Sequence, residues 1–168
     1  EATLTLAERS LTLPLVSATE GSDALGVSAL LKETGTVTYD AGFVNTAACK
    51  SAITFIDGDA GILRYRGYPI EQLANRSDFI ETAYLVIYGE LPAPAQRKEF
   101  GLRLRNNAAV EVQMQKILEG FPTNASPMAM LSALVSALPA YHADLATNNF
   151  EKDLQNFDLA AAIAIAKI

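Results

Sequence analysis

Cysteine, histidine and tryptophan are almost absent from this sequence. Its 168 residues include one cysteine, Cys49, one histidine, His142, and no tryptophan. A single cysteine cannot form an intrachain disulfide, and one cysteine with one histidine cannot supply the ligands of a Cys/His zinc site. Nucleophilic catalysis of the Ser-His-Asp or Cys-His type would have to use His142 alone. The composition therefore excludes a disulfide scaffold and a Cys/His zinc centre within one chain.

Positive charge is also scarce. The chain has 13 Lys and Arg against 19 Asp and Glu, which gives a net charge of −6 and a pI near 4.8. Binding to a phosphate backbone needs clustered cations, so we expect no nucleic-acid partner. We interpret the local basic groups at residues 64–66 and 97–105 as solvated faces. No apolar run reaches the roughly 18 residues of a membrane span. We expect a soluble cytoplasmic protein with no membrane partner.

The first part of the chain shows strand-like patterns. Polar and apolar residues alternate at residues 3–6 and 11–13, and a third short run covers residues 36–39. The strongest signal is a pair of β-prone runs at residues 53–56 and 62–66, which flank an Asp-Gly turn and predict a hairpin. The periodicity becomes helical after Gly67. We therefore predict a mainly α fold with a β-rich N-terminal arm over residues 1–66 and a helical part over residues 67–168.

Capping signals mark several of the expected helices. Asp78 and Glu81 form a capping pair before an apolar helix, and Gly89 is placed to end it. Ser126 and Pro127 are suited to begin another helix, which Pro139 is expected to kink or end. The predicted helices cover residues 70–74, 79–88, 94–104, 110–118, 128–138 and 153–168.

The last helical stretch keeps a strong apolar pattern up to Ile168, without a glycine, asparagine or proline to stop it. We interpret Ile168 as a truncation point inside a longer protein. The alternative is a natural C-terminal helix with a frayed end.

Residue chemistry alone yields no active site. Asp57-Gly58-Asp59 begins like a calcium loop, but Ile62 stands where such a loop needs glycine and Tyr68 where it needs glutamate. A hairpin turn is the better interpretation. We interpret His142 as a residue at a helix C-terminus, where it interacts with the helix dipole, and Cys49 as a small buried thiol. No glycine pattern indicates a nucleotide site. We assign no catalytic, cofactor-binding or metal-binding residue.

A longer pattern carries more information than any of these motifs. The stretch at residues 51–92 contains "ITFIDGDAGILRYRGYPIEQLA" and "YLVIYGELP", and it closely resembles the N-terminal region of bacterial citrate synthases. The resemblance continues through residues 40–47, 121–128 and 140–144. The final Ala-Lys-Ile is similar to the start of the family's "K-[ILM]-P-T" segment, cut before its proline.

The resemblance implies an N-terminal portion of a multi-helical large domain preceded by a β-rich arm. It implies a transferase that condenses acetyl-CoA with oxaloacetate to give citrate and CoA, with acetyl-CoA as a substrate and no cofactor. In the family, an aspartate, two histidines and several arginines carry the reaction, and all lie C-terminal to the matched region. None is placed on this sequence, so we expect the chain to be inactive alone. A homodimer or higher homo-oligomer is also implied.

Two departures argue against carrying over the NADH regulation of some bacterial members. Ser126-Pro127-Met128 stands where many members have His-Pro-Met, and residues 106–110 lack the histidine found there in the family. A serine cannot supply a titratable imidazole.

Two other functions remain open. The first is a 2-methylcitrate synthase portion that uses propionyl-CoA on related architecture. The second is a non-catalytic interaction module, which the lack of a catalytic constellation and the apolar surface expected after Leu159 would support.

Overall fold

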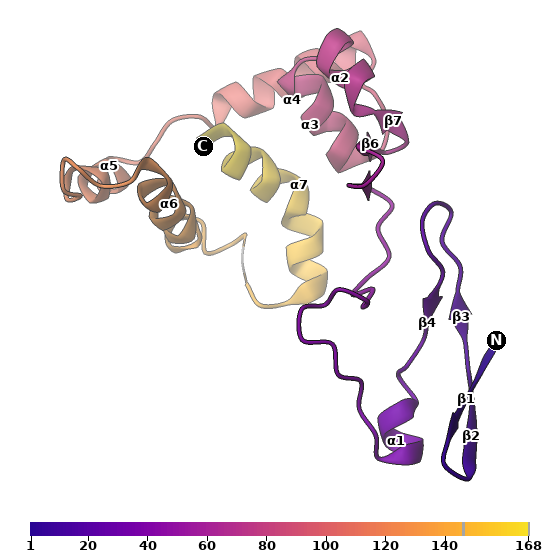
Figure 1. The fold of residues 1–168 in the computed structure, drawn as a ribbon. Coiled ribbons are helices and arrows are strands. Elements are labelled where there is room, and N and C mark those ends of the chain that lie inside the picture. The colour runs from indigo at the N-terminus through magenta and orange to yellow at the C-terminus, as the bar shows by residue number, and fades with distance from the viewer. Residues whose placement is uncertain (146, 168) are drawn as a thin grey trace. The chain divides into compact units, whose positions relative to one another are not determined.

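The computed structural model describes residues 1–145 and 147–167, so Ile168, the expected truncation point, lies outside the described residues. Two compact units make up the chain, Glu1–Leu91 and Pro92–Ile168, and each is described by itself (Figure 1). The boundary expected at residues 66–67 was set by the change from a strand-like to a helical sequence pattern, and it stays a prediction.

The first unit holds the strands and three short helices. Its elements are β1 (Ala2–Leu6), β2 (Arg9–Leu13), β3 (Leu15–Val16), β4 (Ala24–Leu25), α1 (Leu30–Thr34), β5 (Thr54–Asp57), β6 (Ile62–Tyr65), β7 (Tyr68–Pro69), α2 (Ile70–Arg76) and α3 (Phe79–Tyr88). The second unit is helical, with α4 (Pro94–Asn106), α5 (Val112–Glu119), α6 (Pro127–Tyr141) and α7 (Phe150–Lys167). The expectation of a mainly α fold is confirmed.

The predicted hairpin at residues 53–66 forms, and the strand-like runs near the N-terminus also pair with each other. β1 pairs with β2 so that Leu4 lies opposite Leu11, and the alternation brings the leucines to one face while threonines stay exposed. β5 pairs with β6, and β7 adds a third strand to this sheet. At the β5–β6 turn the Asp57 carboxylate accepts a hydrogen bond from the Ala60 amide at 2.9 Å, and Gly61 takes φ +67°. The Asp-Gly segment is therefore a turn stabilised by its own side chain.

The capping pair predicted for α3 is present. The Asp78 carboxylate accepts from the Glu81 amide at 2.9 Å, and the Glu81 carboxylate accepts from the Asp78 amide at 3.4 Å. Gly89 ends the helix at φ +90°, and its amide donates to the Leu85 carbonyl at 2.8 Å. These caps place Tyr84 and Leu85 in the core of the first unit.

Arg66 connects the end of the β-sheet to α3. Its backbone has φ +50°, and its guanidinium donates two hydrogen bonds to the Val86 carbonyl, at 2.8 and 3.2 Å. A third bond reaches the Ala52 carbonyl at 3.3 Å. Val86 lies in the last turn of α3, whose carbonyls lack helical partners. The Arg66 guanidinium supplies the missing hydrogen-bond donor and places a positive charge at the negative end of the helix dipole. Our interpretation of this residue as part of a solvated face was wrong.

The third predicted strand, at residues 36–39, does not form. Residues 36–53 contain no strand, and the Tyr39 side chain is 92% exposed. An alternating run gains ladder hydrogen bonds only when a partner strand lies beside it, and none does here. The Asp40 carboxylate instead organises the loop by accepting hydrogen bonds from the amides of Val44 and Asn45. Hydrogen bonds from Thr46 and Asn45 hold the pKa of Asp40 below its ordinary value.

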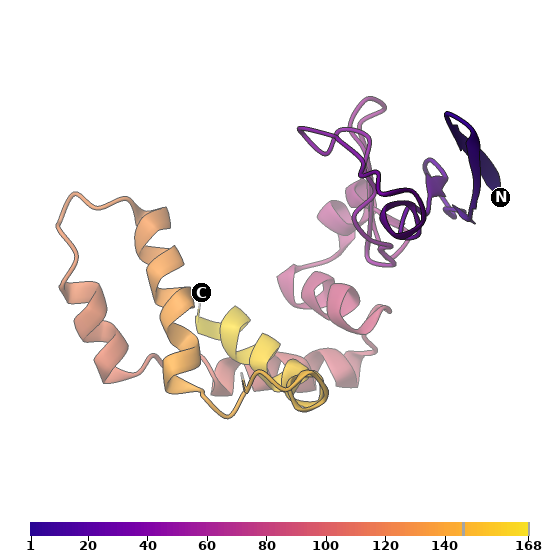
Figure 2. The ribbon, with the colours of Figure 1, turned by 90° about the horizontal axis from the view of Figure 1, so that it is seen from below.

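In the second unit, α5 packs against α6 and α4 packs against α7 (Figure 2). The residues buried in these helices are Phe100, Leu104, Met114, Leu138, Ala162 and Ile163. α6 continues through Pro139 to Tyr141, so the helix ends two residues after the proline. A proline this close to the C-terminus removes only one late hydrogen bond.

α7 begins at Phe150, earlier than the expected Asp153. The Asn149 side chain accepts from the Lys152 amide at 3.1 Å and so acts as the N-cap. Asp153 accepts two hydrogen bonds from Thr147, through its amide and its hydroxyl, and these bonds lower the pKa of Asp153. The polar residues before Asp153 therefore belong to the helix and its cap.

Two N-cap residues allow a matched test of capping. Asp78 bonds its helix amide, whereas Ser126 occupies the N-cap of α6 without a side-chain hydrogen bond. We expect Asp78→Ala to lower the free energy of unfolding by about 1 kcal/mol and Ser126→Ala to leave it nearly unchanged. Urea unfolding followed by far-UV circular dichroism measures both. Equal losses in the two variants would contradict the assignment of the capping box.

Candidate functional site

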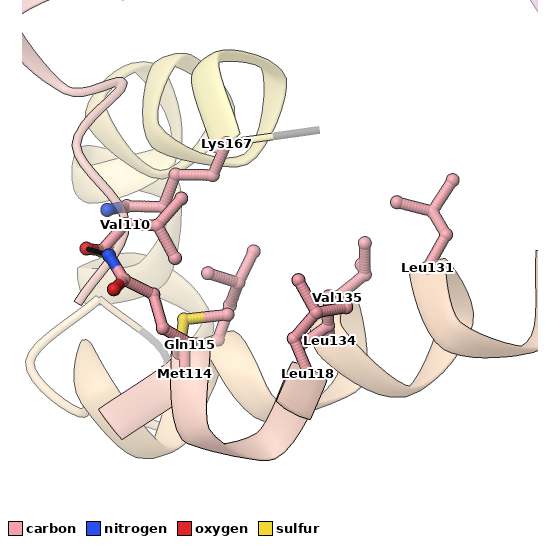
Figure 3. A pocket seen from close by; sticks show the side chains of 9 residues that line it. Val110, Met114, Gln115, Leu118, Leu131, Leu134, Val135 and Lys167 are labelled. Carbon is pink, nitrogen blue, oxygen red and sulfur yellow. Dashed lines mark hydrogen bonds between the residues drawn. The ribbon is translucent and has the colours of Figure 1, made fainter. Parts of the chain in front are cut away.

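The second unit contains a cavity of about 320 Å³ between α5, α6 and the end of α7. Figure 3 shows that apolar side chains from α5 and α6 face one another across it, with Lys167 at one side. The lining residues are Val110, Met114, Gln115, Leu118, Leu131, Leu134, Val135, Leu138 and Lys167. The size and the apolar lining are those of a small-molecule pocket or of a space filled by another apolar side chain.

Helical spacing explains why the walls are apolar. Met114 and Leu118 lie four residues apart on α5, and Leu131, Leu134 and Leu138 repeat on one face of α6. Met114 and Leu138 are buried, whereas Leu118 is 43% exposed. The two helices therefore bury only part of their facing surfaces, and the cavity lies between the remaining side chains.

A charged cluster lies beside the cavity and is centred on Glu111, the N-cap residue of α5. The Lys167 ammonium donates to Glu111 Oε1 at 3.0 Å and also to the Ala109 carbonyl. His142 Nε2 lies 3.3 Å from the same carboxylate oxygen. The Lys167 side chain is only 5% exposed, so its charge depends on these acceptors in place of water. We call Glu111, Lys167 and His142 the Glu111 cluster.

Opposing effects set the ionisation of Glu111. Burial, the largest effect, raises the pKa of this carboxyl, whereas the Lys167 hydrogen bond, the Glu111 amide and the charges of Lys167 and His142 lower it. The lowering effects prevail, and the pKa of Glu111 lies below its ordinary value. The carboxylate therefore stabilises the fold at neutral pH, and this stabilisation is lost as the pH falls through the lowered pKa.

Two atoms of the Glu111 cluster are buried without a hydrogen bond to any described residue, namely Glu111 Oε2 and His142 Nε2. The His142–Glu111 contact has the length of an ion pair but lacks hydrogen-bond geometry. His142 itself follows α6, and its amide donates to the Leu138 carbonyl at 3.1 Å. Its position after the helix matches the sequence interpretation, but Glu111 as its neighbour could not be foreseen from local sequence.

The other sequence candidates are not brought together. Cys49 is exposed within the irregular segment, so our expectation of a buried thiol was wrong, because no element covers that loop. Asp57 and Asp59 remain in the β5–β6 turn. Within residues 1–145 and 147–167, no group of three or more His, Cys, Asp or Glu could hold a metal ion. No helix in the described part of the chain is both long and apolar enough to span a membrane.

Comparison with known proteins gives the family. The sequence profile described as "Citrate synthase, C-terminal domain" matches residues 42–168. The chain belongs to the citrate synthase family. It is 52% identical over 143 residues to citrate synthase 1 of Mycobacterium tuberculosis, in both the CDC 1551 / Oshkosh and H37Rv strains. The alignment covers 85% of this chain and 33% of the relative, so the chain spans about a third of the length of these citrate synthases.

Solved citrate synthases share the fold. The enzyme of Thermoplasma acidophilum, solved as a ternary complex with carboxymethyl coenzyme A and oxaloacetate, matches with a TM-score of 0.63 and 27% identity over 73% of this chain and 31% of that one. The enzyme of Pyrobaculum aerophilum matches with a TM-score of 0.63 and 30% identity over 74% of this chain and 32% of that one. The resemblance stated from residues 51–92 is confirmed.

Two methionines test whether the cavity wall stabilises this citrate synthase unit. Met114 is 3% exposed on the cavity side of α5, and Met128 is 70% exposed at the start of α6. We expect Met114→Ala to lower the free energy of unfolding by about 2–3 kcal/mol, and Met128→Ala to change it by less than about 0.5 kcal/mol. Urea unfolding measures both variants. A similar small loss in each would show that α5 and α6 are not packed through Met114.

Proposed function

We propose that this chain is part of a citrate synthase whose whole protein condenses acetyl-CoA with oxaloacetate to give citrate and CoA. The observation that carries the proposal is the 52% identity over 143 residues to a citrate synthase of Mycobacterium tuberculosis. The Thermoplasma acidophilum enzyme, solved with carboxymethyl coenzyme A and oxaloacetate, supports the same two substrates. Acetyl-CoA then acts as a substrate, and no separate cofactor is needed.

The reaction requires a base that removes a proton from the acetyl methyl group and donors that stabilise the enol and the oxaloacetate carbonyl. The single histidine, His142, faces Glu111 and Lys167 at the edge of the second-unit cavity. The chain also spans only about a third of its relatives. We therefore propose that the catalytic residues lie outside this sequence and that the chain is inactive alone.

The role that remains for the chain is to build part of the large domain. Several of its helices keep large apolar side chains exposed, including Phe150 and Leu154 on α7 and Val112 on α5. Such surface favours association with further protein, either the rest of the enzyme or a second copy. A homodimer or higher homo-oligomer and a cytoplasmic location are parts of this proposal.

The two alternatives differ in what they predict. A 2-methylcitrate synthase would use propionyl-CoA in the same condensation, and its acyl pocket would have to accept one more methylene group. A non-catalytic interaction module would use the same exposed apolar side chains, and a 168-residue chain would then be monomeric and melt cooperatively. We place the acetyl-CoA enzyme first because of the 52% identity to a protein named citrate synthase.

Initial rates decide among these functions. With oxaloacetate present, CoA release by the whole protein is measured with acetyl-CoA and with propionyl-CoA. We expect a higher kcat/KM for acetyl-CoA, and no release above background from the 168-residue chain alone. A preference for propionyl-CoA would support the 2-methylcitrate synthase. Turnover by the isolated chain would contradict the proposal that its catalytic residues lie elsewhere.

A further inference from the structure

The ends of three helices meet at one carboxylate. Glu111 is the N-cap of α5, Lys167 is the last residue of α7, and His142 directly follows α6. Lys167 Nζ and His142 Nε2 lie 3.0 and 3.3 Å from Glu111 Oε1. Lys167 also lines the cavity between α5 and α6 (Figure 3). The carboxylate therefore fixes the position of a side chain that forms part of the cavity wall.

We propose that Glu111 is a pH-dependent latch, which holds the end of α7 at the cavity while its carboxylate is charged and releases that end when it is protonated. The step is a simple protonation, in which one proton binds a carboxylate oxygen of Glu111. No oxidant or second reactant is involved. The inference does not depend on the proposed enzymatic activity.

The burial of Lys167 makes the latch sensitive to charge. Its side chain is 5% exposed, so its ammonium has exchanged water for the Glu111 carboxylate and the Ala109 carbonyl. Once Glu111 is neutral, the ammonium keeps only dipolar acceptors and has no counter-charge at 3.0 Å. A buried cation without a counter-charge is strongly unfavourable, and the long lysine side chain can reach water by moving out. The last turn of α7 then loses its contact with the start of α5.

His142 is the second titratable side chain beside Glu111. It directly follows α6, the helix that packs against α5. Its Nε2 atom is buried and makes no hydrogen bond to a described residue. A protonated imidazole would attract the carboxylate, and it would also lie close to the Lys167 ammonium. The lowered pKa of Glu111 shows the combined effect of these neighbours and keeps the latch closed at neutral pH. Release is therefore expected only in acid.

Hydrogen exchange of the 168-residue chain tests the latch. Protection factors of a peptide from the last turns of α7 are measured between pH 3.5 and 7.5, corrected for intrinsic exchange, with far-UV circular dichroism as a check on folding. In the unaltered chain we expect protection to fall about tenfold in acid, which corresponds to about 1.4 kcal/mol. In Glu111→Gln, an amide oxygen still accepts a hydrogen bond but cannot titrate. We expect a flat profile at the low, acid-state level.

Two further variants keep the result interpretable. Glu119→Gln removes an exposed carboxylate from the other end of α5 and should retain the full acid dependence. Lys167→Met keeps the apolar stem but removes the ammonium, so its profile should also be flat, even if Glu111→Gln fails to fold. Asp153 is another carboxylate of α7 that titrates in acid. Hydrogen bonds from Thr147 lower its pKa. If Glu111→Gln or Lys167→Met retained the acid-dependent loss, Glu111 would not be its cause and the latch would be refuted.

Discussion

Burial of a small set of apolar side chains is the constraint on which both units depend. Among the described residues, the buried set consists of eleven apolar or aromatic side chains, and each helix contributes one or two of them. Helices of this length are marginal in water without tertiary contacts, so each contact surface carries much of the stability of its helix. The cavity beside Met114 and the exposed apolar residues on α7 show that much helix surface stays uncovered within the second unit.

Elements with short-range signals could be predicted from sequence. The Asp78–Glu81 capping box, the Gly89 stop and the β5–β6 hairpin all depend on residues a few positions apart, and all are present. The strand expected at residues 36–39 failed because strand formation needs a distant partner that periodicity does not reveal. Arg66 escaped prediction for a related reason, since its acceptor at Val86 lies 20 residues away.

The family could be inferred from the sequence, whereas the charged cluster at Glu111 could not. Residues 51–92 identified the citrate synthase family, and in this structure they form the β5–β6 hairpin, α2 and α3. These residues carry turns, caps and buried contacts, so their sequence is specific to a scaffold and says little about a reaction. The Glu111 cluster was missed because Glu111 and Lys167 are 56 residues apart. No local pattern marks either of them as a partner of the other.

The contact between Lys167 and Glu111 is costly compared with the alternatives open to the chain. Both groups lose water, and an apolar residue at position 167 could cover the same cavity wall without that desolvation cost. Apolar contacts, however, hardly depend on pH, whereas an ion pair is lost when one partner becomes neutral. The charged pair at Lys167 therefore makes the contact between α7 and the start of α5 depend on protonation, whereas the packing of α5 on α6 through Met114 and Leu138 does not.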